Sequence, residues 1–166
     1  MKQLFSKKLL PLLIIPALML SFTCLPDKAN FTGEWKLNEE KSEFGDFGSR
    51  FAAKTIKVEQ KAESITISKT AASFNGGDNT TTETLTFDGK ESETTVFGNA
   101  KKKSVAKWSD DGQTMTVTYS IAMERNGQAM EFKGTETWSL KDGMLSLVTV
   151  SSSPRGENTT KAMYAK

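Results

Sequence analysis

The 166-residue sequence contains no histidine, one cysteine and three arginines. Histidine is the commonest general base and a frequent metal ligand, so the acid–base and metal chemistry usually built on it has no support here. The sequence also lacks a Gly-x-Ser-x-Gly motif and a glycine-rich phosphate-binding loop. We therefore expect no enzyme activity, no cofactor and no metal site. An enzyme that uses only carboxylates, lysines and tyrosines ranks third, after the two non-enzymatic functions given at the end of this subsection.

Long apolar runs are also absent, except at the start of the chain. Residues 1–23, MKQLFSKKLLPLLIIPALMLSFT, contain three lysines and then an apolar run from Leu9 to Leu20 that two prolines interrupt. A helix needs about 17 to 25 apolar residues to cross a bilayer, so this run is too short. The pattern is typical of a secretory signal peptide, and we expect an exported protein without a permanent membrane span.

Neither sign of charge is in large excess. Removing residues 1–23 takes away three lysines and no acid, which lowers the formal net charge from +2 to −1. The one basic cluster beyond this segment is Lys101-Lys102-Lys103, which we interpret as a solvated turn. With mixed signs elsewhere, nucleic-acid binding has little support.

The single cysteine, Cys24, directly follows the apolar run, in LSFTC. This stretch resembles a lipobox, in which bacterial lipoproteins carry a diacylated cysteine, although Phe22 is bulky and Ser21 stands where leucine is expected. The alternative is ordinary cleavage nearby with a free thiol. We expect lipid attachment at Cys24, a tether over residues 24–30 and a place in the bacterial cell envelope, either membrane-anchored or periplasmic.

From Lys54 onward the dominant pattern is a period of two, in which apolar residues alternate with threonine, serine and charged residues. This alternation is typical of half-buried strands. Dipeptides such as Asp88-Gly89 and Asn126-Gly127 favour tight turns between antiparallel neighbours. The pattern predicts about ten strands, near residues 33–37, 54–59, 64–71, 80–87, 92–97, 103–109, 113–123, 129–140, 144–151 and 158–165.

Residues 31–166 suit a single domain. Ten antiparallel strands in an open sheet would leave two exposed edges, which up-and-down closure removes. We therefore expect an all-β fold, a single up-and-down antiparallel β-barrel, with two stacked sheets as the close alternative. The period of two is lost after the first strand, where Asn38 would cap a short helical segment that Gly45 and Gly48 would end.

Trp35 follows Gly33 by two residues and shares its face of the first strand, so we expect its ring to plug one end of the barrel. This Gly-x-Trp resembles the motif of lipocalins. The stretch FTGEWKLNEEKSEFG, the run of hairpins and the TKAMYAK ending resemble bacterial exported lipocalin-like proteins. The strand plan is also similar to fatty-acid-binding proteins, which have ten strands and a helical insert between the first two.

The chain departs from both families in its arginines. Lipocalins commonly stack a late-strand arginine on the motif tryptophan, and fatty-acid-binding proteins hold a carboxylate with an arginine in the last strand. Here the arginines are Arg50, Arg125 and Arg155, and the last predicted strand offers Lys161 and Tyr164 instead. The resemblance therefore does not imply that this chain binds a ligand carboxylate through an arginine.

Three candidate binding residues share one face of the two longest predicted strands: Tyr119, Phe132 and Glu136. The aromatic side chains would give apolar contact, and Glu136 would orient a polar group. An isolated dry carboxylate costs several kcal/mol, so Glu136 either meets a partner, faces water, or is displaced to an open rim or by a bulge at Gly134.

The leading functional hypothesis is an exported, monomeric module that binds an apolar or amphipathic small molecule. The alternative is a structural or interaction barrel that is filled by its own side chains and binds an envelope partner. Methionines 115, 123, 130 and 144 fit either an adaptable pocket or a packed core.

Overall fold

A computed structural model describes residues 27–166 except 46–47, 74–75, 126 and 154–155. The predicted signal peptide, residues 1–23, and Cys24 lie outside the described residues. Within the described part of the chain, no helix is long and apolar enough to cross a membrane.

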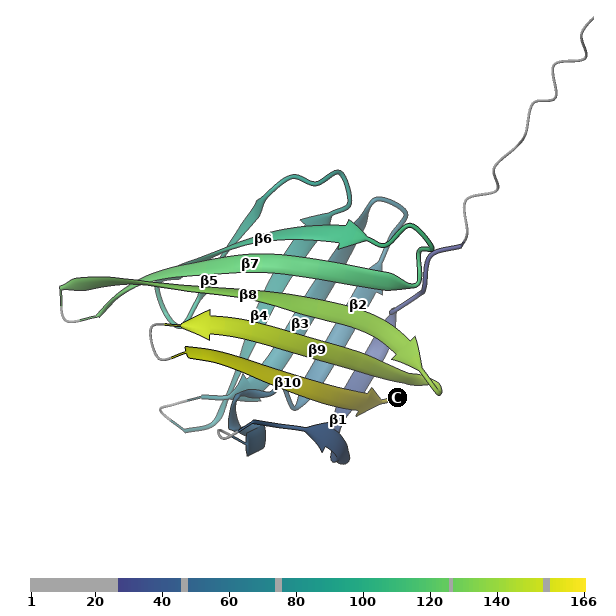
Figure 1. The fold of residues 1–166 in the computed structure, drawn as a ribbon, viewed down its shortest axis with the longest axis horizontal. Helices are drawn as coiled ribbons and strands as arrows, with labels where there is room; N and C mark the ends of the chain where they lie inside the picture. Colours follow the sequence, from purple (N-terminus) through teal and green to yellow (C-terminus); the bar gives the residue numbers. More distant parts are fainter. Residues whose placement is uncertain (1–26, 46–47, 74–75, 126, 154–155) are drawn as a thin grey trace, which may run out of the picture.

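Ten strands form one antiparallel sheet that curls into a barrel (Figure 1). The prediction of an all-β fold is confirmed, and each predicted strand is found with shifted ends. The strands are β1 (Gly33–Glu43), β2 (Thr55–Gln60), β3 (Ser64–Ala72), β4 (Asp78–Thr86), β5 (Ser92–Val96), β6 (Ala100–Trp108), β7 (Thr114–Arg125), β8 (Gln128–Lys141), β9 (Met144–Ser153) and β10 (Gly156–Ala165).

The barrel is nearly closed. The sheet runs in the order β4-β3-β2-β1-β10-β9-β8-β7-β6-β5, so β1 and β10 pair and the two edges are β4 and β5. Side chains bridge these edges: the Ser92 hydroxyl donates to the Thr84 carbonyl at 2.7 Å, and the Thr94 hydroxyl donates to the Thr82 carbonyl at 3.2 Å. Up-and-down closure is therefore completed by side-chain hydrogen bonds, because no backbone ladder joins β4 to β5 among the described strands.

The predicted helix beginning at Asn38 is wrong. Residues 38–43 belong to β1, which continues along β10 until Glu43 lies opposite Lys161, with a register shift after Asn38. The Asn38 side chain accepts a hydrogen bond from the Lys41 amide at 3.1 Å, and so stabilises this irregularity instead of a helix start. After β1, the helical structure in the described residues is a single 3-10 turn, η1 (Gly48–Phe51).

One end of the barrel is closed by an apolar core that includes Trp35, which is 2% exposed. The Trp35 indole N–H donates to the Phe31 carbonyl at 2.8 Å. The ammonium of Lys166 lies 5.0 Å from the centroid of the Trp35 ring, and its side chain approaches the space above Gly33. A lysine therefore stacks on the motif tryptophan where the lipocalin resemblance implies an arginine.

The segment before β1 covers this closed end. The Ala29 amide donates to the Gly112 carbonyl at 2.8 Å, and the Gln60 side-chain amide donates to the Ala29 carbonyl at 2.9 Å. The Phe31 ring stacks on Trp108 with 5.5 Å between centroids. Asp27 and Ala29, which belong to the tether predicted over residues 24–30, thus contact the barrel.

Candidate functional site

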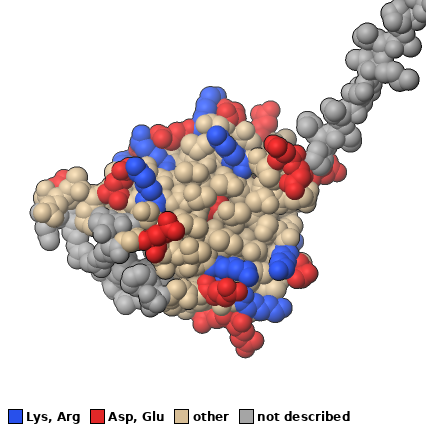
Figure 2. Space-filling view, in the orientation of Figure 1, with Lys and Arg blue, Asp and Glu red and all other residues tan. Residues whose placement is uncertain are grey.

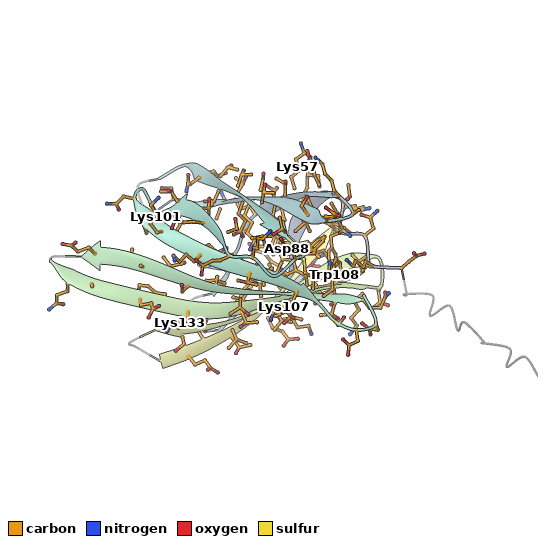
Figure 3. All side chains as sticks on the ribbon, turned by 90° about the horizontal axis from the view of Figure 1, so that it is seen from above. Lys57, Asp88, Lys101, Lys107, Trp108 and Lys133 are labelled. Atoms are coloured by element: carbon orange, nitrogen blue, oxygen red, sulfur yellow. The ribbon has the colours of Figure 1, made fainter. Side chains whose placement is uncertain are left out.

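At the end of the barrel opposite the Trp35 core, which we call the mouth, the β7–β8 hairpin extends beyond the neighbouring strands (Figure 1). The hairpin tip is unpaired on its β6 side because β6 begins at Ala100, whereas β7 continues to Arg125. Figure 3 shows the two ends of β6, with Lys101 near the hairpin and Trp108 toward the end where the N-terminal segment lies.

A groove of about 440 Å³ lies at this step between β6 and the hairpin. Five of its eight lining residues are alanine or methionine and three are polar: Asn99, Ala100, Ala122, Met123, Glu124, Ala129, Met130 and Glu131. Small-molecule sites typically occupy about 300 to 1,000 Å³. The groove is therefore large enough to hold part or all of a small ligand.

A track of inward-facing side chains leads from the groove toward the closed end. Its members are directly opposed pairs of β7 and β8, and their burial increases along the track. In order from the mouth, the pairs are Met123–Met130, Ile121–Phe132, Tyr119–Gly134, Val117–Glu136 and Met115–Trp138. The first two pairs are half-buried, whereas the last two are buried, so the interior is most accessible at the mouth.

Glu136 forms an ion pair inside the barrel. The Lys69 ammonium, from β3 on the opposite wall, lies 2.5 and 2.6 Å from the two carboxylate oxygens of Glu136. The Trp138 indole N–H donates to the same carboxylate at 3.1 Å. The β7–β8 ladder is continuous through Gly134, so the bulge alternative is wrong.

The environment of Glu136 stabilises its charged form. Burial alone would raise the pKa of Glu136, but the ammonium groups of Lys69 and Lys102 oppose this effect. Together with the hydrogen bonds from Lys69 and Trp138, they hold the pKa below its ordinary value. Glu136 therefore stays ionised at neutral pH although it is buried.

A second ion pair lies nearer β4 and β6. The Lys102 ammonium is 2.7 Å from a carboxylate oxygen of Glu83, and the Ser104 hydroxyl donates to the other oxygen at 3.1 Å. All three residues are buried. The same ammonium lies 5.0 Å from the centroid of the Tyr119 ring, which places the second pair beside the track.

The interpretation of the lysine triplet as a solvated turn is wrong. Lys101, Lys102 and Lys103 belong to β6, whose alternation turns Lys102 inward and its two neighbours outward. The outer lysines form exposed ion pairs with Glu93 and Glu91. The period of two through Ala100, Ser104 and Ala106 is the sequence signal that could have identified Lys102 as an interior residue.

Tyr119 and Gly134 form a matched cross-strand pair. A Cβ atom at position 134 would collide with the hydroxyl end of Tyr119 and the Val150 carbonyl, so the glycine makes room for the ring. Burial, together with the charges of Glu136 and Glu83, raises the pKa of Tyr119 to about 12. Its hydroxyl therefore stays protonated and able to donate a hydrogen bond at neutral pH.

The structure thus places the three predicted site residues on one track, with Tyr119 and Glu136 close together and Phe132 nearer the mouth. Lys69, Lys102 and Glu83 were not predicted. Lys161, which the resemblance highlighted, pairs with Glu43 at 3.2 Å on the outer side, whereas Tyr164 is buried in the core.

No protein-family model matches this sequence, and no curated protein sequence matches it either. Among solved structures, the chain is similar to REP1-NXSQ fatty acid transporter, with a TM-score of 0.56 and 18% identity over 81% of this chain and 94% of that chain. A mutant of the same transporter gives a TM-score of 0.54 at 18% identity, over 81% and 96% of the two chains.

Zebrafish ileal bile acid-binding protein complexed with cholic acid is also similar, with a TM-score of 0.53 and 17% identity over 82% of this chain and 98% of that chain. At such identities the similarity shows the fold. The protein therefore has the fold of an antiparallel ten-stranded barrel, similar to the folds of this transporter and this bile acid-binding protein.

Proposed function

We propose that this protein is a monomeric, non-enzymatic binding module for one apolar or amphipathic small molecule. The observation that carries the proposal is the apolar track from the groove of about 440 Å³ through Ile121 and Phe132 to the interior charges. The similar structures support it, because they include a fatty acid transporter and a bile acid-binding protein complexed with cholic acid.

The residues of the track suit an apolar ligand. Met123 and Met130 have flexible, polarizable side chains that adapt to irregular shapes. Apolar area that leaves water stabilises the complex by roughly 25 cal/mol per Å² before the costs of association. Because the barrel is packed at the Trp35 end, the ligand would lie in the mouth half, with its polar end toward Tyr119 and Glu136.

We expect the ligand-free protein to bind an apolar fluorescent probe at about one site per chain. Phe132→Ala should weaken this binding about tenfold, because it removes the aromatic surface between the groove and the interior. Leu140→Ala, which truncates a 42% exposed apolar residue near the closed end, is the matched control and should leave affinity unchanged. Fluorescence titration measures both. Equal effects of the two substitutions, or no probe binding, would contradict the proposal.

A second candidate function, an interaction barrel that binds an envelope partner, is favoured by the outer face of β7, β8 and β9. Figure 2 shows few charges across the middle of this face, while charges of both signs gather around its edges. Aligned positions such as Thr116, Thr137 and Val148 form this surface. If this outer face is the functional surface, Thr118→Lys should abolish binding of the envelope partner, because it adds a charge to the face. Binding of the apolar probe should stay intact.

We further propose export and anchoring through a lipid on Cys24. Asp27 follows Cys24 by three positions, and its carbonyl accepts a hydrogen bond from the Gln113 side chain at 3.0 Å on the closed end. The short spacing would hold the closed end toward the membrane and turn the mouth away from it.

Mass spectrometry of the native N-terminal peptide should detect a diacylated Cys24, and Cys24→Ala should release the protein from membranes. A free thiol at Cys24 would refute the anchor.

A further inference from the structure

The barrel interior balances its own charge. Among the described residues, its charged side chains are two lysines and two glutamates: Lys69, Lys102, Glu83 and Glu136. Each lysine already contacts a glutamate, at 2.5 Å for Lys69 and 2.7 Å for Lys102. From this pairing we infer that the ligand has an uncharged polar end, such as a hydroxyl or an ester, and that the site discriminates against carboxylates. The inference rests on the binding function proposed above.

The Lys69–Glu136 pair is the one that a ligand would meet. Its side chains are 21% and 10% exposed, against 10% and 5% for the Lys102–Glu83 pair. Both oxygens of Glu136 contact the Lys69 ammonium, and one also accepts the Trp138 N–H. An incoming carboxylate would therefore either displace Glu136 from its lysine or lie beside a like charge, and both are unfavourable in a desolvated site.

Uncharged hydrogen-bonding groups surround the same level of the barrel. Tyr119 lies next to Glu136 in the track, and Thr149 lies directly opposite Glu136 on β9. Thr160 lies opposite Thr149 on β10. Hydroxyl groups both donate and accept hydrogen bonds, so this set suits a ligand group that does the same without a charge.

The first experiment compares decanol with decanoate as competitors of an apolar fluorescent probe on the mature protein at about pH 8. Partition of the two compounds into neutral detergent micelles gives the preference that arises from hydrophobicity alone. We expect the protein's preference for decanol to exceed that reference about tenfold, because like-charge contacts reject the carboxylate. A preference equal to or below the micelle reference would overturn the inference. Absence of probe binding would instead show that the proposed binding function itself is wrong.

The second experiment releases a lysine. Glu136→Gln leaves Lys69 without its carboxylate partner, so decanoate binding should strengthen about tenfold while decanol binding changes little. Glu83→Gln tests the same effect at Lys102. The matched control is Glu93→Gln, which frees the surface Lys101 and should leave both affinities unchanged. The double variant Lys69→Met/Glu136→Gln should lose the gain in decanoate binding.

A folded Glu136→Gln protein with an unchanged decanoate-to-decanol ratio would overturn the inference. The wild-type comparison with micelles needs no variant, so it decides the question even if Glu136→Gln does not fold.

Discussion

Trp35→Ala should lower the free energy of unfolding by about 3 to 5 kcal/mol, the usual cost of truncating a large buried aromatic side chain. Trp35 is 2% exposed, and its indole N–H donates a hydrogen bond to the Phe31 carbonyl at 2.8 Å. Alanine would leave a cavity and an unsatisfied carbonyl at the closed end, where Phe31 and Trp108 are stacked. Denaturant unfolding followed by circular dichroism measures the change.

The matched control for Trp35 is Phe97→Ala. Phe97 is also a large aromatic side chain, but it is 59% exposed in the turn between β5 and β6. Its truncation should change the free energy of unfolding by less than about 0.5 kcal/mol, as is usual for surface positions. Similar losses for the two variants would mean that the Gly-x-Trp stretch does not anchor the core.

Lys69→Met should destabilise the barrel by about 3 to 5 kcal/mol, the range for removing one partner of a buried ion pair. Met fills similar space, so the loss reports mainly the uncompensated charge of Glu136. The double variant Lys69→Met/Glu136→Gln removes that charge and should recover most of the loss. Chemical denaturation of the wild type, both single variants and the double variant gives the coupling energy. Additive losses would show that the pair is not coupled.

The pH dependence of Lys69→Met provides an independent check. In the wild type the pKa of Glu136 lies below its ordinary value near 4.5, so its contribution is present above that value and is lost as the pH falls through the lowered pKa. Without Lys69, burial should dominate and raise the pKa of Glu136. As the pH falls, protonation of Glu136 then removes the cost of its unpaired buried charge. The stability gap between variant and wild type should therefore shrink from about pH 7 to about pH 4. A constant gap would contradict this assignment.

The strands and their inward faces follow from local chemistry, which explains why they could be predicted from the sequence. Met115, Val117, Tyr119 and Ile121 alternate with polar residues, and a period of two fixes which side chains share a face. Phe132 and Glu136 were placed on the same side as Tyr119 because a tight hairpin fixes the pairing of adjacent strands.

The ion pairs could not be predicted in the same way. Lys69 and Glu136 are 67 positions apart and meet because barrel closure brings β3 opposite β8. Alternation gives the face of each residue but not its height on the opposite wall. The helix prediction failed for a related reason: Asn38 and the lost period also fit an irregular strand that β10 continues to pair.

The central claim, that a ligand lies along the β7–β8 track, is tested most directly by backbone NMR spectra of the isotope-labelled protein recorded with and without saturating decanol. The account predicts chemical-shift changes concentrated at Ile121, Met123, Met130 and Phe132, with the closed-end turn at Gly112 unchanged. Changes confined to the outer face of the sheet or to the closed end, or an unchanged spectrum at saturation, would contradict it.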